Sequence, residues 1–366
     1  MRRFFRIYIV PGAVFQSVMV GGGYGTGREA VEYFTSYGAV GGFLGIGVAF
    51  VLLALVLATT FEYSRSFGTY DYRHFFKSLL GPGWIAFEIL MIFIFLLVLA
   101  VLASAAGNIL RDNFGISYVV GLLIMLTVVG TLTFFGQQLI TRVLTFWSFF
   151  LYAVFIAFFI LVFMHSGAST EAAFDDVQIV SGWWLSGARY AMYNVAIAPM
   201  LLYVTREFRT RGEAVRSGVV AGAIAMAPAL VFQYTFLTAW PAVLDEAIPV
   251  YWMIGRLGLT VFVVVYTIML FGTFIETGAG LLQGINERID GYLLESHGNR
   301  LKPAYRAAIA VVAILLSAAL SLLGITALIA KGYGAMSWGF LIVYIVPLLT
   351  YGIYQLSRKQ SPDLTS

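Results

Sequence analysis

Residues 21–29 read GGGYGTGRE and combine a flexible backbone with two charged side chains. Five glycines in seven positions disfavour a continuous helix, because a helical glycine costs about 1 kcal/mol relative to alanine. Backbone amides and carbonyls that are freed from a helix can bind a small solute or an ion, and Arg28 could bind an anionic group. The predicted substrate-binding residues of this segment are Gly21, Gly22, Gly23, Tyr24, Gly25, Thr26, Gly27 and Arg28.

A second group of polar residues lies in the segment FGTFIETGAGLLQGINER, residues 271–288. Glu276 precedes Asn286 and the charged end of the segment by ten residues, which places it about 15 Å into a bilayer. A carboxylate at that depth is costly in lipid and is expected to face the protein interior. Three- and four-residue spacing predicts one shared, inward helix face for Thr273, Glu276, Thr277 and Gly280.

This helix face has three possible roles. Thr273 and Thr277 could bind a sodium ion near Gly21, Glu276 could carry a proton, or Glu276 could form a structural ion pair with Arg28. The predicted ion- or proton-coupling residues are Glu276, Thr273, Thr277 and Glu29. The sequence predicts no cofactor other than a sodium ion at this site.

The segment YNVAIAPM, residues 193–200, offers a further site. Pro199 removes a backbone donor and clashes with the preceding turn, so we expect the helix to be interrupted between Asn194 and Pro199. Tyr190, Tyr193 and Asn194 are the predicted substrate-binding residues here. Simpler interpretations are a kink at the proline and tyrosines that anchor the span at the membrane interface.

The composition identifies the elements that must position these residues. Hydrophobic residues make up 60% of the 366 and charged residues 11%, whereas soluble proteins have about 25% charged residues. Apolar runs long enough to cross a bilayer recur along the chain, which predicts a polytopic all-α membrane protein. The ten predicted spans cover residues 8–35, 39–61, 83–110, 117–135, 139–164, 183–204, 215–240, 253–286, 304–329 and 334–356.

Charged residues between the spans predict the topology. Lys and Arg are concentrated in the segments that are cytoplasmic if the N-terminus is cytoplasmic, such as 2–6 and 206–216, whereas the segments STEAAFDD and VLDEAIP on the other side are acidic. This bias places both termini in the cytoplasm. The expected location is the bacterial cytoplasmic (inner) membrane.

Ten spans divide into two sets of five, and an odd number per set makes the second set enter the membrane in the opposite direction. Such inverted repeats with broken helices are typical of secondary transporters. We therefore predict discontinuous first and sixth helices, and close helix packing at the small residues of 41–47 and 218–225. The predicted parts are a first repeat 1–164, an extracellular linker 165–182, a second repeat 183–356 and a cytoplasmic tail 357–366.

Other interpretations of the glycine segment are weaker. A potassium filter needs Thr-Val before Gly-Tyr-Gly and a pore helix, whereas Gly21 and Gly22 stand there. A dinucleotide fingerprint needs a parallel sheet, and a lone strand leaves its backbone groups unsatisfied in a bilayer. A continuous span over 7–27, with the glycines in an outer loop, remains an alternative.

The segment GGGYGTGREAVEYF resembles the GAGFASGQE…FF signature of the YkvI-like bacterial membrane proteins. These are relatives of the amino acid–polyamine–organocation transporters, which have the LeuT fold. The resemblance implies a five-plus-five inverted repeat with substrate held between the breaks of helices 1 and 6, here 21–27 and 193–199. Arg28 stands where the signature has Gln, which puts a neutral substrate site in doubt.

The sequence predicts an ion- or proton-coupled secondary transporter of a small solute, an amino acid or a related organic anion, working by alternating access. Its expected partners are that solute and the lipid bilayer, with no nucleic acid. The alternatives are a passive channel and a transporter-fold sensor or receptor. An enzyme is not expected, because there is no cysteine and no His-Glu-x-x-His or Gly-x-Ser-x-Gly motif.

Overall fold

The structure is a computed structural model that describes residues 2–19, 21–135, 137–165, 174, 179–298 and 300–360. Over these residues the chain forms helices and turns, without a β-strand. Six helical stretches are long and apolar enough to cross a membrane: Arg28–Phe67, Tyr72–Phe114, Arg211–Leu237, Thr260–His297, Pro303–Ser321 and Ile325–Lys359. Three shorter apolar helices cover Phe5–Met19, Tyr118–Thr133 and Phe150–Met164.

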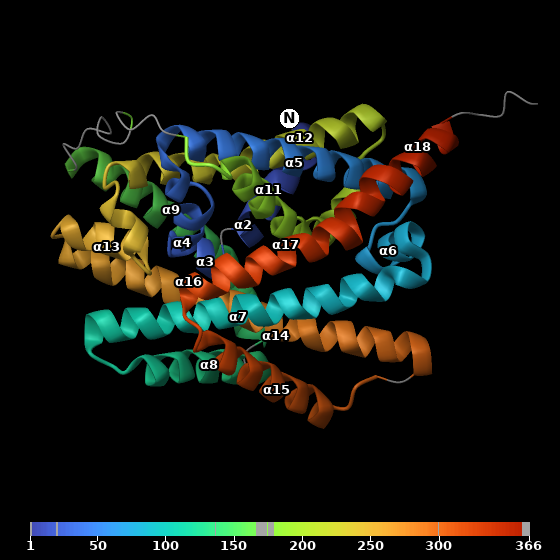
Figure 1. Cartoon of the computed structure of the whole chain (residues 1–366). Coiled ribbons are helices and arrows are strands. Elements are labelled where there is room, and N and C mark those ends of the chain that lie inside the picture. The colour runs from blue at the N-terminus through green and yellow to red at the C-terminus, as the bar shows by residue number, and fades with distance from the viewer. Residues whose placement is uncertain are drawn as a thin grey trace, which may run out of the picture.

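The long helices form two groups that run roughly side by side (Figure 1). One group contains α5 (Gly38–Phe67), α11 (Trp183–Asn194) and α12 (Arg211–Leu237). The other contains α7 (Trp84–Phe114), α8 (Tyr118–Phe135), α14 (Thr260–His297) and α15 (Pro303–Ser321). Between the groups lie the short helices α2 (Val10–Met19), α3 (Gly22–Gly25) and α4 (Arg28–Tyr33).

Glycines allow the helices of the first group to approach each other closely. A Cβ atom at Gly218 of α12 would lie 2.3 Å from the backbone nitrogen of Ala58 in α5. A Cβ at Gly187 of α11 would lie 2.1 Å from the carbonyl oxygen of Gly45 in α5. Both distances are too short for any other residue, so the predicted close packing of the small-residue segments is confirmed.

Several predicted helix boundaries are wrong, and glycine turns account for two of them. The span predicted over 253–286 is divided into α13 (Pro249–Arg256) and α14, because Gly258 has φ +67° and ends the first helical run. The last span begins at Ile325 rather than at 334, directly after Gly324 with φ +83°. Both sides of each glycine are apolar, so hydropathy alone does not reveal these turns.

The remaining elements complete the bundle. Helix α6 (Tyr72–Leu80) connects α5 to α7, and α9 (Gln137–His165) follows α8. The last segment contains α16 (Ile325–Ala327), α17 (Gly334–Phe340) and α18 (Ile353–Gln360), with π-helical turns between them. The predicted linker 165–182 and tail 357–366 lie for the most part outside the described residues.

Candidate functional site

A cavity lies where the short helices α2, α3 and α4 meet α7, α11 and α14. It leaves about 110 Å³ for the centres of water-sized molecules, and one water centre needs about 10–15 Å³. The cavity can therefore hold a solute of several heavy atoms. Its polar lining residues are Gly21, Gly23, Glu29, Tyr193, Asn194, Thr277 and Tyr333. Its apolar lining residues are Val18, Met19, Met91, Ile94, Phe95, Val98, Ala196, Ile197, Met200 and Leu281.

The glycine segment forms one wall of this cavity. After α2 ends at Met19, Gly21 is extended, with φ −67° and ψ −170°. The single turn α3 follows, and Gly27 has φ +81°, a conformation that favours glycine, immediately before α4 begins. The Thr26 hydroxyl donates to the Gly23 carbonyl at 2.6 Å and accepts from the Arg28 amide at 3.2 Å. Local hydrogen bonds therefore hold the segment in a defined shape that departs from a continuous helix.

Glu29 presents a buried carboxylate to the cavity and is only 5% exposed. The Tyr193 hydroxyl of α11 donates a hydrogen bond to Glu29 Oε2. Glu29 Oε1 lies 2.2 Å from the position that a Cβ at Gly23 would take, so a glycine there makes room for the carboxylate. Within the described part of the chain, Glu29 has no ion pair. A buried carboxylate of this kind must bind a proton, a cation or a cationic ligand.

Tyrosine rings from three segments surround Glu29. The Tyr193 ring lies 5.6 Å from the ring of Tyr33 in α4 and 4.8 Å from that of Tyr333 in the last segment. The Tyr33 hydroxyl donates to the carbonyl of Ile329 at 3.2 Å, which ties α4 to the last segment. Tyr333 was missed by the sequence analysis, because the predicted last span began one residue after it and left it in a loop.

Arg28 points away from the cavity. Its Nη1 donates to the carbonyls of Leu244 and Glu246 at 2.8 and 3.1 Å, and its Nη2 forms an ion pair with Glu32 at 3.0 Å. The side chain is buried, with 6% of the residue exposed, and does not line the cavity. The alternative ion pair with Glu276 is not formed, because helix geometry already places Glu32 one turn from the guanidinium.

The loop that carries the Leu244 and Glu246 carbonyls is also hydrogen-bonded to the glycine segment. The Val250 amide, at the start of α13, donates to the Thr26 carbonyl at 3.2 Å. A Cβ at Gly27 would lie 2.9 Å from the Val250 side chain and 2.5 Å from Phe236. The loop from η5 (Ala242–Asp245) to α13 therefore lies against the side of the glycine segment that carries Arg28.

Only part of the predicted α14 face points inward. Thr277 lines the cavity, and its Oγ1 would lie 3.8 Å from a Cβ at Gly21. Thr273 is buried and donates to the Met269 carbonyl at 2.9 Å. Glu276 is half-buried and does not line the cavity, while Gly280 is exposed with open space around it. The prediction of one inward face is wrong, because the cavity meets α14 only along the side that includes Thr277.

Between Asn194 and Pro199, where the sequence predicts an interruption, the chain stays helical and changes its helix type. The α-helix α11 ends at Asn194 and continues as the 3-10 helix η4 (Val195–Glu207), which contains Pro199. Asn194 lines the cavity and donates its side-chain amide to the Tyr190 carbonyl at 2.9 Å. Tyr190 is fully buried behind the lining residues. Its ring packs against Tyr33 and Tyr193, so it supports the cavity wall.

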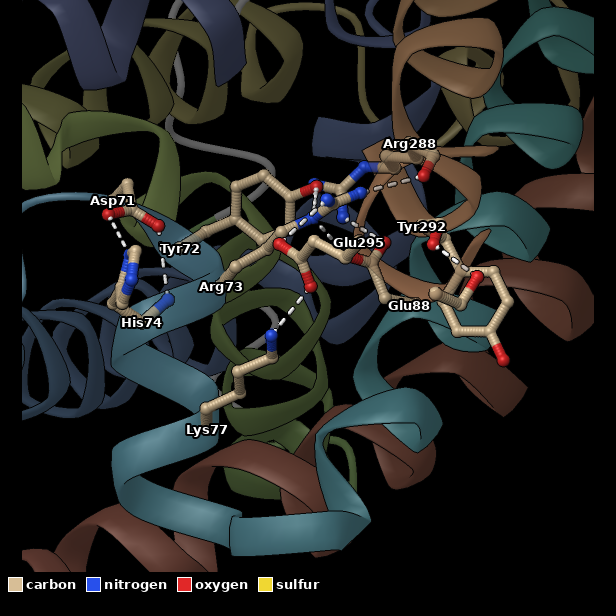
Figure 2. A network of polar contacts seen from close by, with 10 residues as sticks. Asp71, Tyr72, Arg73, His74, Lys77, Glu88, Arg288, Tyr292 and Glu295 are labelled. Carbon is tan, nitrogen blue, oxygen red and sulfur yellow. Dashed lines mark hydrogen bonds and ion pairs between the residues drawn. The ribbon is translucent and has the colours of Figure 1, made fainter. Parts of the chain in front are cut away.

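Further along α14, an ion-pair network joins α6 and α7 to this helix (Figure 2). Arg288 donates to Glu88 at 2.7 Å, and both residues are buried. Arg73 of α6 donates to the Arg288 carbonyl at 2.8 Å and to Glu295 at 3.1 Å. A Cβ at Gly291 would lie 2.4 Å from the Arg73 guanidinium, so this glycine provides the space that Arg73 occupies. These residues do not line the cavity and connect helices around it.

Comparison with known sequences shows similarity to a bacterial membrane protein. No family model matches the chain. The chain is 24% identical over 290 residues to the uncharacterized membrane protein YkvI of Bacillus subtilis (strain 168). The alignment covers 76% of this chain and 80% of YkvI. The resemblance to YkvI inferred from the glycine signature is confirmed.

Solved structures identify the fold. A manganese transporter of Eremococcus coleocola superposes with a TM-score of 0.61 at 12% identity, over 93% of this chain and 77% of the transporter. A Na⁺-coupled sialic acid symporter gives 0.61 at 12% identity, over 96% and 83%. Mhp1 in its inward-facing conformation gives 0.54 at 16% identity, over 97% and 77%. The chain shares the all-helical LeuT fold of these transporters.

Proposed function

We propose that this protein is a secondary active transporter that moves a small solute across the bacterial cytoplasmic membrane by alternating access. The observation that carries the proposal is the cavity beside the extended Gly21, with a buried carboxylate in its wall. This carboxylate, Glu29, forms no ion pair with another described residue. Non-helical backbone is tolerated at membrane depth where it lines a cavity. The LeuT fold, shared with three transporters, supports this function over an enzyme.

Helix packing supports a five-plus-five inverted repeat. If α2, α5, α7, α8 and α9 are spans one to five, then α11 with η4, α12, α14, α15 and α17 are spans six to ten. The contact of α2 with α12 is then matched by that of α11 with α5. Likewise α7–α8 is matched by α14–α15, and α9–α14 by α17–α7. Packing that survives the exchange of the two halves is expected for a repeat of this kind.

The exposure of two lining residues supports a state that is open on the side proposed to be cytoplasmic. Val18 and Met200 line the cavity and are 44% and 39% exposed. With the N-terminus in the cytoplasm, both residues lie on the cytoplasmic side of the glycine segment. On the other side, the cavity is closed by the buried rings of Tyr33 and Tyr193 and by the loop held to Arg28.

Solute transport could be coupled to a proton or to a sodium ion, and the two ions would use different atoms of the site. A proton could be carried by Glu29, which faces the cavity, or by Glu276, which does not line it. A sodium ion could be held by the Thr277 hydroxyl and backbone carbonyls near Gly21, where the two segments are adjacent. Oxygen ligands of this kind suit a hard cation such as sodium. Because Glu29 is the carboxylate in the cavity, we propose it as the coupling residue.

Proteoliposomes test the function. Purified protein is reconstituted, a proton or a sodium gradient is imposed, and uptake of labelled amines, amino acids and organic acids is measured. A transporter accumulates at least one solute above its equilibrium level, and collapse of the driving gradient abolishes the accumulation. Equilibration without accumulation would indicate the passive channel. Solute binding without any flux would indicate the sensor or receptor.

A further inference from the structure

The charge of the cavity lining is negative. Glu29 is the charged residue among the residues that line the cavity in the described part of the chain. The adjacent Arg28 is engaged with two loop carbonyls and Glu32, so it does not neutralise Glu29. An anionic solute would therefore bring a second negative charge next to Glu29 at low dielectric, where like charges repel strongly.

The two carboxylate oxygens of Glu29 have different surroundings. Oε2 accepts the hydrogen bond from the Tyr193 hydroxyl. Oε1 lies over Gly23, which also lines the cavity, and it has no hydrogen bond to another described residue. One oxygen thus holds the carboxylate in place, and the other is available to a donor that enters the cavity.

The surroundings of Glu29 suit a cation with an apolar body. The rings of Tyr33, Tyr193 and Tyr333 pack against one another beside the carboxylate. Aromatic faces attract ammonium groups within about 6 Å of the ring centroid. Ten of the lining residues are aliphatic, phenylalanine or methionine, and methionine adapts its shape to irregular ligands.

We propose that the transported solute is a small organic ammonium ion with an apolar body of a few carbon atoms, and that it competes with a proton for Glu29. The ammonium group donates to Glu29 Oε1, and the apolar body lies against the methionine and isoleucine side chains. When the ammonium enters, the carboxyl proton leaves toward the open side of the cavity. Exchange of one cation for the other then couples solute movement to a proton gradient. This inference rests on the proposed transport function.

The charged and titratable groups around Glu29 include two arginines, one glutamate and five tyrosines. On its own helix, Arg28 and Glu32 pair with each other, and Arg189 of α11 stacks on Trp338 at 5.7 Å. Free tyrosine titrates near pH 10, well above the pH range in which a carboxylate takes up a proton. The titratable groups that face Glu29 are Tyr24, Tyr33, Tyr190, Tyr193 and Tyr333. Ammonium affinity should therefore fall on acidification through protonation of Glu29.

The test uses three probes with the same carbon skeleton: isopentylamine, isopentanol and isovalerate. Binding to the purified full-length protein in detergent is measured by calorimetry between pH 6 and 8.5. We expect the amine to bind at least tenfold more tightly than the alcohol, with affinity that rises with pH, and the acid not to bind. Equal or tighter binding of the alcohol or the acid, or no binding of the amine, would overturn the inference.

Variants of adjacent carboxylates assign the effect to one residue. Glu29→Gln should lower amine affinity at least tenfold and remove its pH dependence, with the weak alcohol binding unchanged. Glu32→Gln is the matched control, because Glu32 lies on the same helix but pairs with Arg28 outside the cavity. If Glu29→Gln does not fold, Glu29→Asp should keep the preference for the amine at reduced affinity. Unchanged amine binding in Glu29→Gln would refute the role of this carboxylate.

The binding assay and the transport assay can fail separately. Gradient-driven accumulation of a carboxylate, without amine binding, would leave the proposed function intact and refute the ammonium. Amine binding that depends on Glu29, without transport of any solute, would support the ligand chemistry and refute transport.

Discussion

Replacing Arg28 with glutamine would release the loop that closes the cavity on the side proposed to be extracellular, called the outer side. In the structure the guanidinium donates to the carbonyls of Leu244 and Glu246 and pairs with Glu32. A glutamine amide is shorter and uncharged, so it could keep at most one of these contacts. In an outward-open state the loop must move away, and Arg28 would lose both carbonyl acceptors. The substitution therefore destabilises the closed state more than the open one.

The magnitude follows from the contacts that are lost. A hydrogen bond from a charged donor contributes about 1.5–3 kcal/mol. The ion pair adds little, up to about 1 kcal/mol, because the Glu32 side chain is 26% exposed. Loss of one to two carbonyl bonds thus costs about 3 kcal/mol, which is more than a hundredfold in the equilibrium between closed and open states.

Thiol labelling measures this equilibrium. The chain has no cysteine, so a single Val250→Cys reports on the loop without background. Val250 is buried against the glycine segment. A membrane-impermeant maleimide is applied from the outer side. We expect Arg28→Gln to raise the rate at which it labels Val250→Cys at least tenfold. Arg256→Gln is the control, because Arg256 is exposed on α13 and stacks on Trp252 of the same helix.

The alternative explanations give different results. If Arg28 binds the solute, Arg28→Gln should weaken solute binding by a hundredfold and leave labelling unchanged. If it only supports the fold, the variant should melt at a lower temperature with labelling at the wild-type rate. An unchanged labelling rate would therefore refute the closure of the outer side by Arg28.

Two further predictions concern α14. Glu276→Gln should keep gradient-driven accumulation of the solute, whereas Glu29→Gln should allow solute exchange but no accumulation. The reason is that, of these two carboxylates, Glu29 lines the cavity and Glu276 does not. Uptake into proteoliposomes measures both, and loss of accumulation in Glu276→Gln alone would reverse this assignment. Gly291→Ala should lower the free energy of unfolding by about 1–3 kcal/mol, because its Cβ would displace the Arg73 guanidinium. Gly280→Ala should leave the free energy of unfolding unchanged or raise it by up to about 1 kcal/mol, since open space surrounds Gly280. Equal shifts of the melting temperature in the two glycine variants would contradict the prediction that Gly291 makes room for the Arg73 guanidinium.

Some of the site was predictable because its signal is local. The glycines of 21–27 are poor helix formers wherever they occur, and the structure places Gly21 and Gly23 in the cavity wall. Glycine at 218 allows close packing with any neighbour, and the neighbour is α5. Such features depend on backbone conformation and side-chain size, which a sequence states directly.

The roles of the charged residues were harder to predict. Residue type and spacing predict that Arg28 binds a substrate anion and that Glu276 faces the protein interior. Both assignments depended on which way a helix face is turned. The structure turns Arg28 toward Leu244, more than two hundred residues away, and leaves Glu276 half-buried outside the cavity lining. Tyr333 was missed for a related reason, because a glycine turn moved the start of its span.

The sequence by itself determined that the chain is an all-helical membrane protein, that the chain at 21–27 departs from a regular helix, and that no cysteine chemistry is available. Apolar run length, glycine content and residue type suffice for these conclusions. Only the tertiary structure decided which carboxylate faces the cavity and which arginine is engaged elsewhere. The rotation of each helix about its axis decides which of its side chains face the cavity. Turning a helix by one residue position exchanges a lining side chain for its sequence neighbour, which lies on another face. That choice is made by contacts between segments far apart in the chain, such as Glu29 with Tyr193 and Arg28 with Glu246.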